Sequence, residues 1–407
     1  MRRVVITGMG LRSALGNTPD ELFDALLAGR SAVQTLDEWR SIADLQCLVG
    51  APAPSFDPGD IPRKHRRSMG KVAMMAVTAA VDAVKMAGLD EATLTGGRTG
   101  AAIGSTMGSN KAEEEFWRHH LETGSAYGLK STHFLKVMSH TCATNVAMFL
   151  GLTGEAISTN AACASSNQAI GAALDRIRYG RVDVMLAGGA DELHVAAAIT
   201  FDVMGGGSRA FTDQPHRTPR PFDAQRDGIV VGEGAGILVL EAYEHAIARG
   251  ATILGEVLGY GGASDAVNMA HPAPEGMVTA IRLALRDAGI DASAIDYVSA
   301  HATGTPIGDA AEAEALYEVF GGEVPVSSTK GHLGHTMGAC GALEAITCLL
   351  AMQRGIVPPT LNLEQPDVAP ILLPTQPLAR PLRHALSTNF AFGGVNTAVV
   401  LEGPQRP

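Results

Sequence analysis

Residues 158–168 read Ser-Thr-Asn-Ala-Ala-Cys-Ala-Ser-Ser-Asn-Gln, and the interpretation of the whole chain starts from this stretch. An apolar pair at 156–157 leads into it, and small residues from 164 to about 178 lead out of it. The pattern predicts a buried strand that turns into a buried helix, with Cys163 at the turn. A thiol there faces the positive helix end and free backbone N–H groups, which lower its pKa and favour a nucleophile. Taken alone, Cys163 fits a small buried core residue better, so the remaining sequence has to decide.

The composition narrows the classes of protein that the chain can form. Of its 407 residues 46% are hydrophobic and 18% are charged, and the formal net charge is −11. That length gives one large or two fused domains, and the acidic balance disfavours general nucleic-acid binding. No apolar run approaches the roughly 18 residues of a membrane span. The opening residues predict a first strand rather than a signal peptide.

Five cysteines, at positions 47, 142, 163, 340 and 348, form no Cys-x-x-Cys pair. An odd number of cysteines without paired spacing argues against a disulfide framework or a zinc ribbon, and for a reducing compartment. We therefore expect a cytoplasmic protein.

Predicted strands and helices alternate along the chain, and the pattern begins again near its middle. The strand before Cys163 has a counterpart before Lys330, and residues 236–241 have a counterpart at 397–401. This repetition predicts two duplicated α/β halves with mostly parallel sheets between helices. We place the halves at 1–250, which carries the cysteine nucleophile candidate, and at 251–407, which carries two histidine motifs.

Three further stretches contain residues suited to chemistry. They are His301-Ala-Thr-Gly-Thr-Pro-Ile-Gly-Asp309, Ser327-Ser-Thr-Lys-Gly-His-Leu-Gly-His335 and Asn389-Phe-Ala-Phe-Gly-Gly-Val-Asn396. Each follows or joins a predicted strand, and active-site loops converge at the carboxyl ends of strands in α/β sheets. One thiol and two imidazoles are thus expected at one pocket. The alternative for any single histidine is a hydrogen-bonded structural residue, and a metal site at His332-x-x-His335 is disfavoured because a Gly-rich loop frames it poorly. We expect no metal.

These motifs together resemble the β-ketoacyl-acyl-carrier-protein synthases, the decarboxylating condensing enzymes of the thiolase-like fold. The resemblance covers essentially the whole chain and includes Val-Val-Ile-Thr-Gly-Met-Gly at 4–10, Ala-Gly-Gly-Ala-Asp-Glu at 187–192 and Arg-Pro-Phe-Asp at 220–223. It is strongest toward the synthase I and II group and the related type II polyketide and polyene ketosynthases. It implies an αβαβα architecture and a β-ketoacyl-carrier-protein synthase, an acyltransferase.

The resemblance assigns a role to each motif. Cys163 matches the nucleophile that carries the acyl chain as a thioester, and His301 and His335 match the two catalytic histidines. Lys330 matches a supporting lysine, for which the candidate acidic partners are Asp309, Glu312 and Glu344. Thr303 and Thr305 match hydroxyls that hold the pantetheine arm. Phe392 matches a gating phenylalanine, whose backbone N–H is expected to form an oxyanion hole with that of Cys163.

The expected reaction is a decarboxylative Claisen condensation in a ping-pong cycle. Two neutral imidazoles stabilise the enolate formed when a malonyl thioester loses CO₂, without any metal. The carbanion then attacks the acyl thioester on Cys163 and extends a fatty-acid, polyketide or aryl-polyene chain by two carbons. No cofactor is expected, since substrates arrive on the phosphopantetheine of an acyl carrier protein.

The chain departs from the family pattern at a few positions near these motifs. They are Ala161, Ala302, Gly304, the Gly331-His-Leu segment and Ala391, with Cys340 and Met337 as residues that reshape the pocket. None removes a catalytic group. Ala391 adopts positive φ less easily than Gly, which bears on how the gate moves. These departures leave the acyl chain length and type open.

A basic cluster stands out in the acidic chain. Its members are Arg63, Lys64, Arg66 and Arg67, and Lys130 is added to them. It fits either a solvated helix start or a docking site for an acidic acyl carrier protein. The resemblance also implies a homodimer, with a heterodimer containing a chain-length factor left open. We expect Thr141 or Cys142, on a helix near 139–147, to reach the partner's acyl pocket.

Other classes of protein compete with this interpretation. A non-catalytic chain-length factor is the main alternative, but such proteins typically lack the nucleophile that this chain keeps. A thiolase or a Cys–His hydrolase is the remaining alternative. A biosynthetic thiolase is expected to carry a second catalytic cysteine near its C-terminus, where this chain has Phe392 and Gly393.

Overall fold

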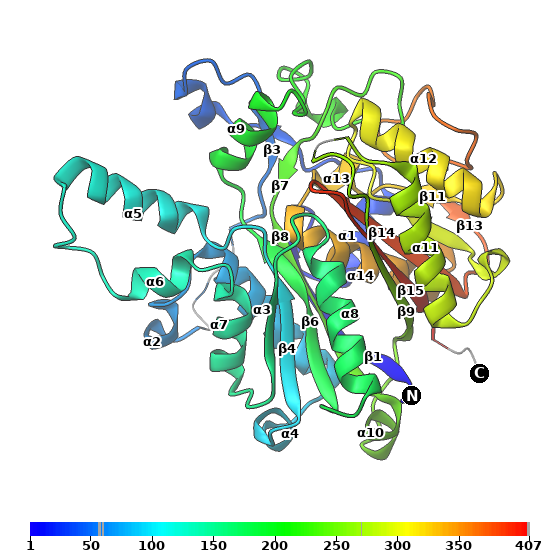
Figure 1. The fold of residues 1–407 in the computed structure, drawn as a ribbon, viewed down its shortest axis with the longest axis horizontal. Helices are drawn as coiled ribbons and strands as arrows, with labels where there is room; N and C mark the ends of the chain where they lie inside the picture. Colours follow the sequence, from blue (N-terminus) through cyan, green and yellow to red (C-terminus); the bar gives the residue numbers. More distant parts are fainter. Residues whose placement is uncertain (56–57, 59–60, 270, 405–407) are drawn as a thin grey trace.

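The computed structural model describes residues 1–55, 58, 61–269 and 271–404. One ten-stranded sheet runs through it, in the order β11-β10-β14-β15-β9-β1-β8-β6-β4-β5 (Figure 1). The strands are β1 (Val4–Ser13), β4 (Thr99–Gly104), β5 (Ala156–Thr159), β6 (Val184–Asp191), β8 (Gly234–Ala242), β9 (Gly255–Ser264), β10 (Tyr297–Ser299), β11 (Val326–Ser327), β14 (His384–Ala391) and β15 (Val395–Glu402). The predicted first strand is therefore confirmed.

Counted inward from each edge of the sheet, the strands of the two halves occupy equivalent positions. Each half pairs its strands in the same way: β4 is parallel to β5 and β6 as β10 is to β11 and β14, whereas β8 and β15 run antiparallel to their neighbours. The duplication expected from the sequence is thus visible in the topology, in a more evenly mixed sheet than expected. The halves join where Val5 and Ile6 of β1 pair with β9. The boundary at 250/251 stays a prediction.

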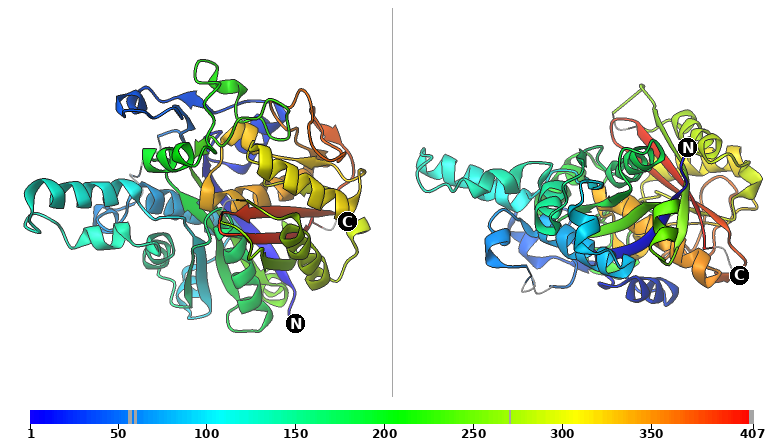
Figure 2. Two further views of the ribbon diagram at one scale, coloured as in Figure 1. Left: turned by 45° about the horizontal axis from the view of Figure 1, so that its top comes forward. Right: turned by 90° about the horizontal axis from the view of Figure 1, so that it is seen from below.

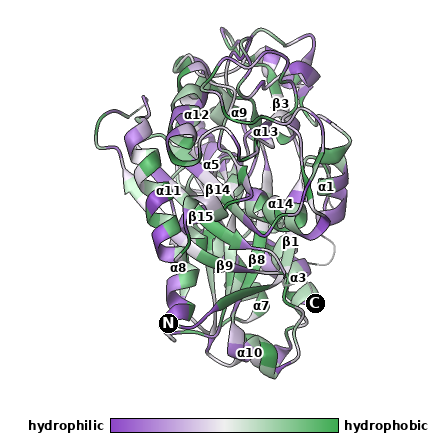
Figure 3. Cartoon of the chain, turned by 90° about the vertical axis from the view of Figure 1, so that its right-hand side faces the viewer, coloured by the Kyte–Doolittle hydropathy of each residue, from purple (hydrophilic) through white to green (hydrophobic). Residues whose placement is uncertain are grey.

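Helices cover both faces of this sheet, and one lies inside the molecule. They include α3 (Lys71–Ala87), α8 (Ser165–Arg178), α11 (Pro274–Ala288) and α14 (Cys340–Arg354), the last buried along nearly its whole length. The sheet strands carry mostly hydrophobic residues (Figure 3). Glycine allows close packing: a Cβ on Gly10 of β1 would lie 2.1 Å from the Ala79 carbonyl oxygen of α3. This close approach explains part of the high glycine and alanine content.

An arm of two helices projects from the body. It consists of α5 (Asn110–Thr123) and α6 (Thr132–Val137), coloured cyan in Figures 1 and 2. Several large apolar side chains of the arm are exposed, namely Trp117, Leu121, Tyr127 and Phe134.

The remaining elements are short or peripheral. The helices are α1 (Pro19–Leu27), α2 (Arg63–Arg66), α4 (Glu91–Thr95), α7 (Thr141–Leu150), α9 (Val195–Val203), α10 (Tyr243–Ala248), α12 (Pro306–Phe320) and α13 (Lys330–Leu333). The small strands are β2 (Gln34–Thr35), β3 (Val49–Ala51), β7 (Val231–Gly232), β12 (Ile356–Val357) and β13 (Leu378–Ala379). Among the described helices, none is long and apolar enough to cross a membrane.

Candidate active site

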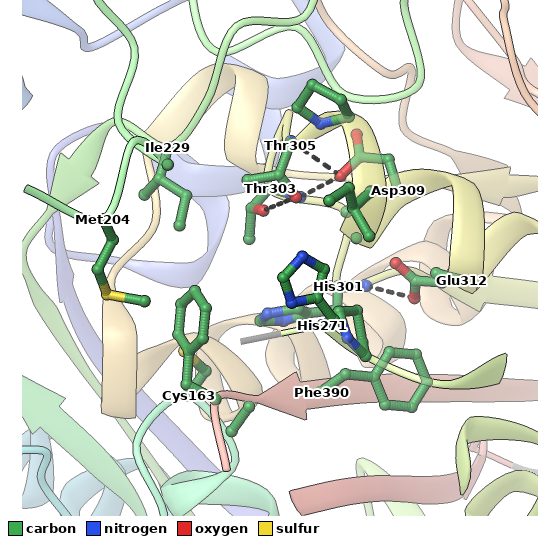
Figure 4. A pocket seen from close by; sticks show the side chains of 18 of the residues that line it. Cys163, Met204, Ile229, His271, His301, Thr303, Thr305, Asp309, Glu312 and Phe390 are labelled. Carbon is green, nitrogen blue, oxygen red and sulfur yellow. Dashed lines mark hydrogen bonds between the residues drawn. The ribbon is translucent and has the colours of Figure 1, made fainter. Parts of the chain in front are cut away.

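Four loops that the sequence singled out meet at one cavity of about 300 Å³ (Figure 4). Cys163 lies between β5 and α8, His301 follows β10, His335 follows α13, and Phe392 follows β14. Other lining residues include Met204, Ile229, His271, Thr303, Thr305, Asp309, Glu312 and Phe390. The predicted meeting of one thiol with two imidazoles is therefore observed.

Cys163 and His335 are in direct contact. Nε2 of His335 lies 2.9 Å from Sγ of Cys163, and both side chains are buried. The backbone of His335 is clamped to the loop and strand at 230–232: its N–H donates to the Val230 carbonyl, and its carbonyl accepts from the Gly232 N–H. Within the described chain, Nδ1 of His335 has no hydrogen-bond partner. Because a buried N–H is rarely left without an acceptor, we assign the proton of His335 to Nε2, facing the thiol and the cavity.

Both partners of this contact are held neutral. Burial, together with the nearby charge of Lys330, holds the pKa of His335 well below its ordinary value. Burial also raises the pKa of Cys163 to about 12, although the Lys330 charge works in the opposite direction. The expectation of a lowered thiol pKa is therefore wrong, because removal of the thiol from water outweighs the effects that favour the thiolate. The resting pair is a thiol beside an imidazole.

The turn that carries Cys163 is sharply bent. Ala162 has φ of +47°, the left-handed region, which costs a non-glycine residue about 1 kcal/mol or more. The hydroxyl of Ser165 stabilises the turn, since it donates to the Ala162 carbonyl at 2.7 Å and accepts from the Ala161 N–H at 2.9 Å. Ala161 contributes its backbone N–H to the turn, so its departure from the family pattern leaves this hydrogen bond in place.

Two buried carboxylates hold the His301 loop. Glu312 accepts the His301 N–H at 2.8 Å and the Thr388 hydroxyl at 2.8 Å. Asp309 accepts the N–H group of Thr303 at 3.0 Å, and also those of Gly304 and Thr305. Burial raises the pKa of Glu312 to about 7 and that of Asp309 to about 6.

The imidazole of His301 lies beside that of His335. Their ring centroids are 5.2 Å apart with an interplanar angle of 85°, and the Phe390 ring stands 6.3 Å from His301 on another side. Burial, the charge of Lys330 and the neighbouring His335 hold the pKa of His301 well below its ordinary value. Both histidines can therefore act as neutral N–H donors, as the resemblance implied.

Lys330 is a buried cation with one acidic partner. Its ammonium group forms an ion pair with Glu344 of α14, and both side chains are 1% exposed. Burial works to lower the pKa of Lys330, but the Glu344 charge outweighs it and keeps the lysine protonated. Of the three candidate partners, Glu344 is confirmed. Asp309 and Glu312 bind backbone N–H groups of the His301 loop instead.

The two threonines expected to hold pantetheine lie on the cavity wall above His301 (Figure 4). Their hydroxyl oxygens are 3.3 Å apart. Gly304 stands between them with φ of +85°, and a Cβ there would lie 3.1 Å from the Gly228 carbonyl oxygen. Glycine at this departure therefore suits the local backbone better than a residue with a Cβ does. Ala302 is buried, and its carbonyl accepts the Ser328 hydroxyl.

The gating turn differs from the expectation at one residue. Ala391 ends β14 in extended backbone, paired with Val395, and its φ is not positive. The positive φ values of the turn, +88° and +71°, fall on Gly393 and Gly394. Alanine at 391 therefore costs no backbone strain in this conformation. Phe392 is 38% exposed, and its ring packs on Phe201 of α9 at 6.1 Å.

His332 does not belong to the site. Its Nδ1 faces the Arg30 carbonyl at 2.9 Å, and its Nε2 faces the Pro359 carbonyl at 3.1 Å. The two histidines of His332-x-x-His335 therefore do not form a metal site together, because the His332 ring contacts two backbone carbonyls whereas the His335 ring contacts Cys163. The ligand atoms of Cys163, His301 and His335 do lie within 4.8 Å of one another, a spacing at which a metal ion could be held. That no metal binds stays a prediction.

The basic cluster is on the surface. Arg63, Lys64 and Arg67 are exposed, as is Lys130 of the arm, and Arg66 is half-buried. Within the described residues none of these five side chains forms an ion pair, which leaves their charge available. By contrast, Thr141 and Cys142 of α7 are fully buried in their own chain, so neither reaches outward as expected. Cys142 packs in the core beside α3 instead.

The sequence interpretation missed two kinds of site residue. Met204, Ile229 and His271 line the cavity, and the sequence interpretation assigned none of them a role in the site. Asn389 begins a recognised motif, yet its contact with Nδ1 of His301, at 3.4 Å, depends on tertiary packing. Cys340 was expected to reshape the pocket. It instead packs against Cys163, and its thiol donates to the Cys163 carbonyl.

Comparison with curated proteins finds relatives along the whole chain. Nodulation protein E of Rhizobium meliloti (strain 1021) is 41% identical, and the match covers 98% of this chain and 99% of the relative. The 3-oxoacyl-[acyl-carrier-protein] synthase 1 of Escherichia coli (strain K12) is 35% identical over 98% of this chain and 99% of the relative.

Solved structures share the fold at full length. A beta-ketoacyl synthase from Burkholderia phymatum STM815 superposes with a TM-score of 0.96 at 46% identity, covering 100% of both chains. The ishigamide ketosynthase/chain length factor gives 0.91 at 36% identity, covering 99% of this chain and 100% of that one. A type II polyketide ketosynthase bound to its acyl-carrier protein gives 0.91 at 29% identity, with the same coverage.

Two family models complete the comparison. The beta-ketoacyl synthase N-terminal domain matches residues 1–246, and the C-terminal domain of the same family matches residues 254–364. Synthase-named relatives do not favour the chain-length-factor alternative, and Cys163, His301 and His335 all meet at the cavity. The chain therefore belongs to the beta-ketoacyl synthase family of condensing acyltransferases.

Proposed function

We propose that this synthase carries the growing acyl chain on Cys163 and uses His301 and His335 to drive malonyl decarboxylation. The observation that carries the proposal is the 2.9 Å contact between His335 and the Cys163 thiol, with the His301 ring beside it in the same cavity. In the first half-reaction the thiol attacks an acyl thioester on the carrier. A new C–S bond forms at Cys163, the carrier C–S bond breaks, and the pantetheine sulfur takes up the proton.

In the second half-reaction a malonyl thioester loses CO₂, and the electrons of the broken C–C bond form an enolate. Two neutral imidazole N–H groups suit the enolate oxygen, because they stabilise negative charge without giving up a proton. The enolate carbon attacks the acyl carbonyl on Cys163, and the backbone N–H groups of Cys163 and Phe392 hold the resulting oxyanion. Collapse of that intermediate expels the Cys163 thiolate, which takes up a proton from solvent. Thr303 and Thr305 position the pantetheine arm.

An acyl carrier protein is the proposed partner. A structural relative forms a complex with its carrier, and the exposed cluster at 63–67, with Lys130, offers positive charge on a chain of net charge −11. Such a patch steers an acidic partner and raises its association rate. Charge reversal at Arg63 and Arg67 should raise the KM for the acyl carrier protein. The rate at which a small acyl-pantetheine thioester acylates Cys163 should stay unchanged, because that substrate has no carrier protein to dock.

We also propose a cytoplasmic homodimer. Two observations support the homodimer. Strand β5 lies at the edge of the sheet, and large apolar side chains near it are exposed, namely Met148 of α7 and the aromatic residues of the arm. Exposed apolar surface of this kind commonly marks a protein interface. Analytical ultracentrifugation of the purified chain distinguishes the homodimer from a monomer that needs a chain-length factor.

The lining of the cavity indicates the kind of acyl substrate that fits it. The cavity is lined mainly by apolar side chains, among them Met204, Ile229 and Phe390, which suit a hydrophobic chain. A panel of carrier-bound acyl chains that differ in length and unsaturation, with malonyl carrier as extender, separates fatty-acid from polyene or polyketide use. Transfer of none of the panel to Cys163 would overturn the proposal.

A further inference from the structure

Asn389 is a buried amide that connects the Lys330–Glu344 ion pair to the catalytic site. It lies in β14 and is fully enclosed. Its Nδ2 donates to Glu344 Oε2 at 2.7 Å and stands 3.4 Å from both Nδ1 of His301 and Sγ of Cys340. Space for the amide is provided by Gly341, where a Cβ would lie 2.3 Å from Asn389 Oδ1. One side chain thus touches the ion pair and a histidine of the site.

The contact with Glu344 fixes which way the amide points. A carboxylate accepts hydrogen bonds, so the NH₂ end of Asn389 must face Glu344 rather than the carbonyl oxygen. The NH₂ group has a second hydrogen, and that hydrogen is directed to the side on which His301 and Cys340 lie. An imidazole nitrogen accepts a hydrogen bond more strongly than a thiol sulfur does. The second hydrogen is therefore assigned to Nδ1 of His301.

We propose that Asn389 is a positioning residue that sets the tautomer of His301. Because Nδ1 accepts from the amide, the ring proton resides on Nε2. Nε2–H is then the group that His301 presents to the thioester oxygen in the cavity. His335 reaches the same Nε2–H form by another route, since its Nδ1 has no partner within the described chain. The inference rests on the proposed role of His301 and adds the residue that makes the ring a donor.

The first test reads the tautomer directly in the wild-type enzyme. ¹⁵N NMR of ring-labelled histidines, with the His301 signals assigned by their loss in His301→Gln, distinguishes a protonated Nε2 from a protonated Nδ1. We expect His301 as a single neutral form with the proton on Nε2. A proton on Nδ1 in the wild-type protein overturns the proposal, and this measurement needs no Asn389 variant to fold.

The second test removes the donor and keeps the volume. Asn389→Leu should mix the His301 tautomers and slow malonyl decarboxylation by about 10- to 100-fold, the size of effect known for lost hydrogen-bond partners of metal-ligating histidines. Acylation of Cys163 should remain nearly unchanged. The matched control is Asn167→Leu: Asn167 is equally buried beside Gly341, but neither of its amide atoms has a partner in the described chain. It should leave the tautomer unchanged.

The outcomes separate this inference from the proposed function. If His301→Ala itself spares decarboxylation, the proposed role of His301 fails. If His301→Ala abolishes decarboxylation while Asn389→Leu changes neither the rate nor the NMR spectrum, only the role of Asn389 fails. An equal loss of acylation and decarboxylation in Asn389→Leu would show a structural role and would also overturn the positioning proposal.

Discussion

The loops that carry His301 and His335 bring the same side chain to the same cavity, but they are held by different chemistry. The His301 loop is bound by two buried carboxylates, Asp309 and Glu312, that accept backbone N–H groups. The His335 loop is bound by backbone pairing at 230–232, and it begins at Lys330, a buried cation paired with Glu344. A lone carboxylate in the interior titrates near neutral pH, whereas a paired charge stays fixed. The two loops should therefore respond differently to substitution and to pH.

The largest effect is expected at the ion pair. Lys330→Met leaves Glu344 buried without its cation, and loss of one partner of a buried pair commonly costs about 3–5 kcal/mol. Urea unfolding should show a loss of free energy of unfolding of that order. Lys330→Met combined with Glu344→Leu should recover part of it. A single variant as stable as the wild type would show that the pair does not hold the loop.

The two histidines should differ in which half-reaction they affect. Removal of a hydrogen-bond donor from an oxyanion site commonly costs about 10²–10³ in rate, so His301→Ala and His335→Ala should both slow decarboxylation by that order. Of the two histidines, only His335 contacts the thiol, at 2.9 Å. His335→Ala should therefore also slow acylation of Cys163, while His301→Ala should spare it. Stopped-flow acylation beside CO₂ release measures both, and identical profiles for the two variants would contradict the geometry.

The carboxylates of the His301 loop should make stability depend on pH. Burial raises the pKa of Glu312 from 4.5 to about 7, so the folded state holds its proton longer than the unfolded state does. Its stabilising contribution is complete below about pH 4.5 and is lost as the pH rises through 7. Residue 312 has no proton to lose in Glu312→Gln. Between pH 4.5 and 8 the free energy of unfolding of this variant should therefore rise, relative to that of the wild type, by on the order of 3 kcal/mol.

Urea unfolding at several pH values checks this prediction. The exposed Glu314 lies on the same helix, and Glu314→Gln should follow the wild-type pH dependence. A Glu312→Gln profile parallel to the wild-type profile would show that the carboxylate does not titrate in this range.

The smallest effect on activity is expected at Gly304, between the two threonines that are proposed to hold the pantetheine arm. Gly304 and Gly393 have nearly equal φ, +85° and +88°, but a Cβ meets neighbouring atoms at 3.1 Å only at Gly304. Alanine at either position should cost about 1 kcal/mol through the backbone. Gly304→Ala should additionally raise the KM for malonyl carrier protein, because Thr303 and Thr305 move with it. Equal kinetics for the two variants would contradict the assigned role of these threonines.

Sequence motifs were sufficient for the family, the fold class and the residues that meet at the cavity. Cys163, His301 and His335 each stand in a motif that a strand end positions, and such local patterns survive in any tertiary context. The direction of the Cys163 pKa could not be predicted in this way. A helix end is visible in the sequence, whereas the degree of burial that outweighs it depends on the packing of several distant segments.

Contacts between distant segments explain the other differences. Asn389 is 45 residues from Glu344 and 88 from His301 in the chain, so no spacing rule connects them. Which of three acids pairs with Lys330 depends on the turn between helices α13 and α14. Ala391 drew attention as a departure, yet the positive φ of the gating turn falls on the next two glycines, which only the strand register reveals.

The most direct test of the account is the mass of the enzyme after incubation with an acyl carrier thioester. The wild-type protein should gain the mass of one acyl group per chain and release it upon addition of malonyl carrier, with one CO₂ per product. Cys163→Ala should gain no mass, while the Cys340→Ala control should still be acylated. An acyl adduct that persists in Cys163→Ala, or a wild-type enzyme that gains none, would contradict the assignment of Cys163 as the nucleophile.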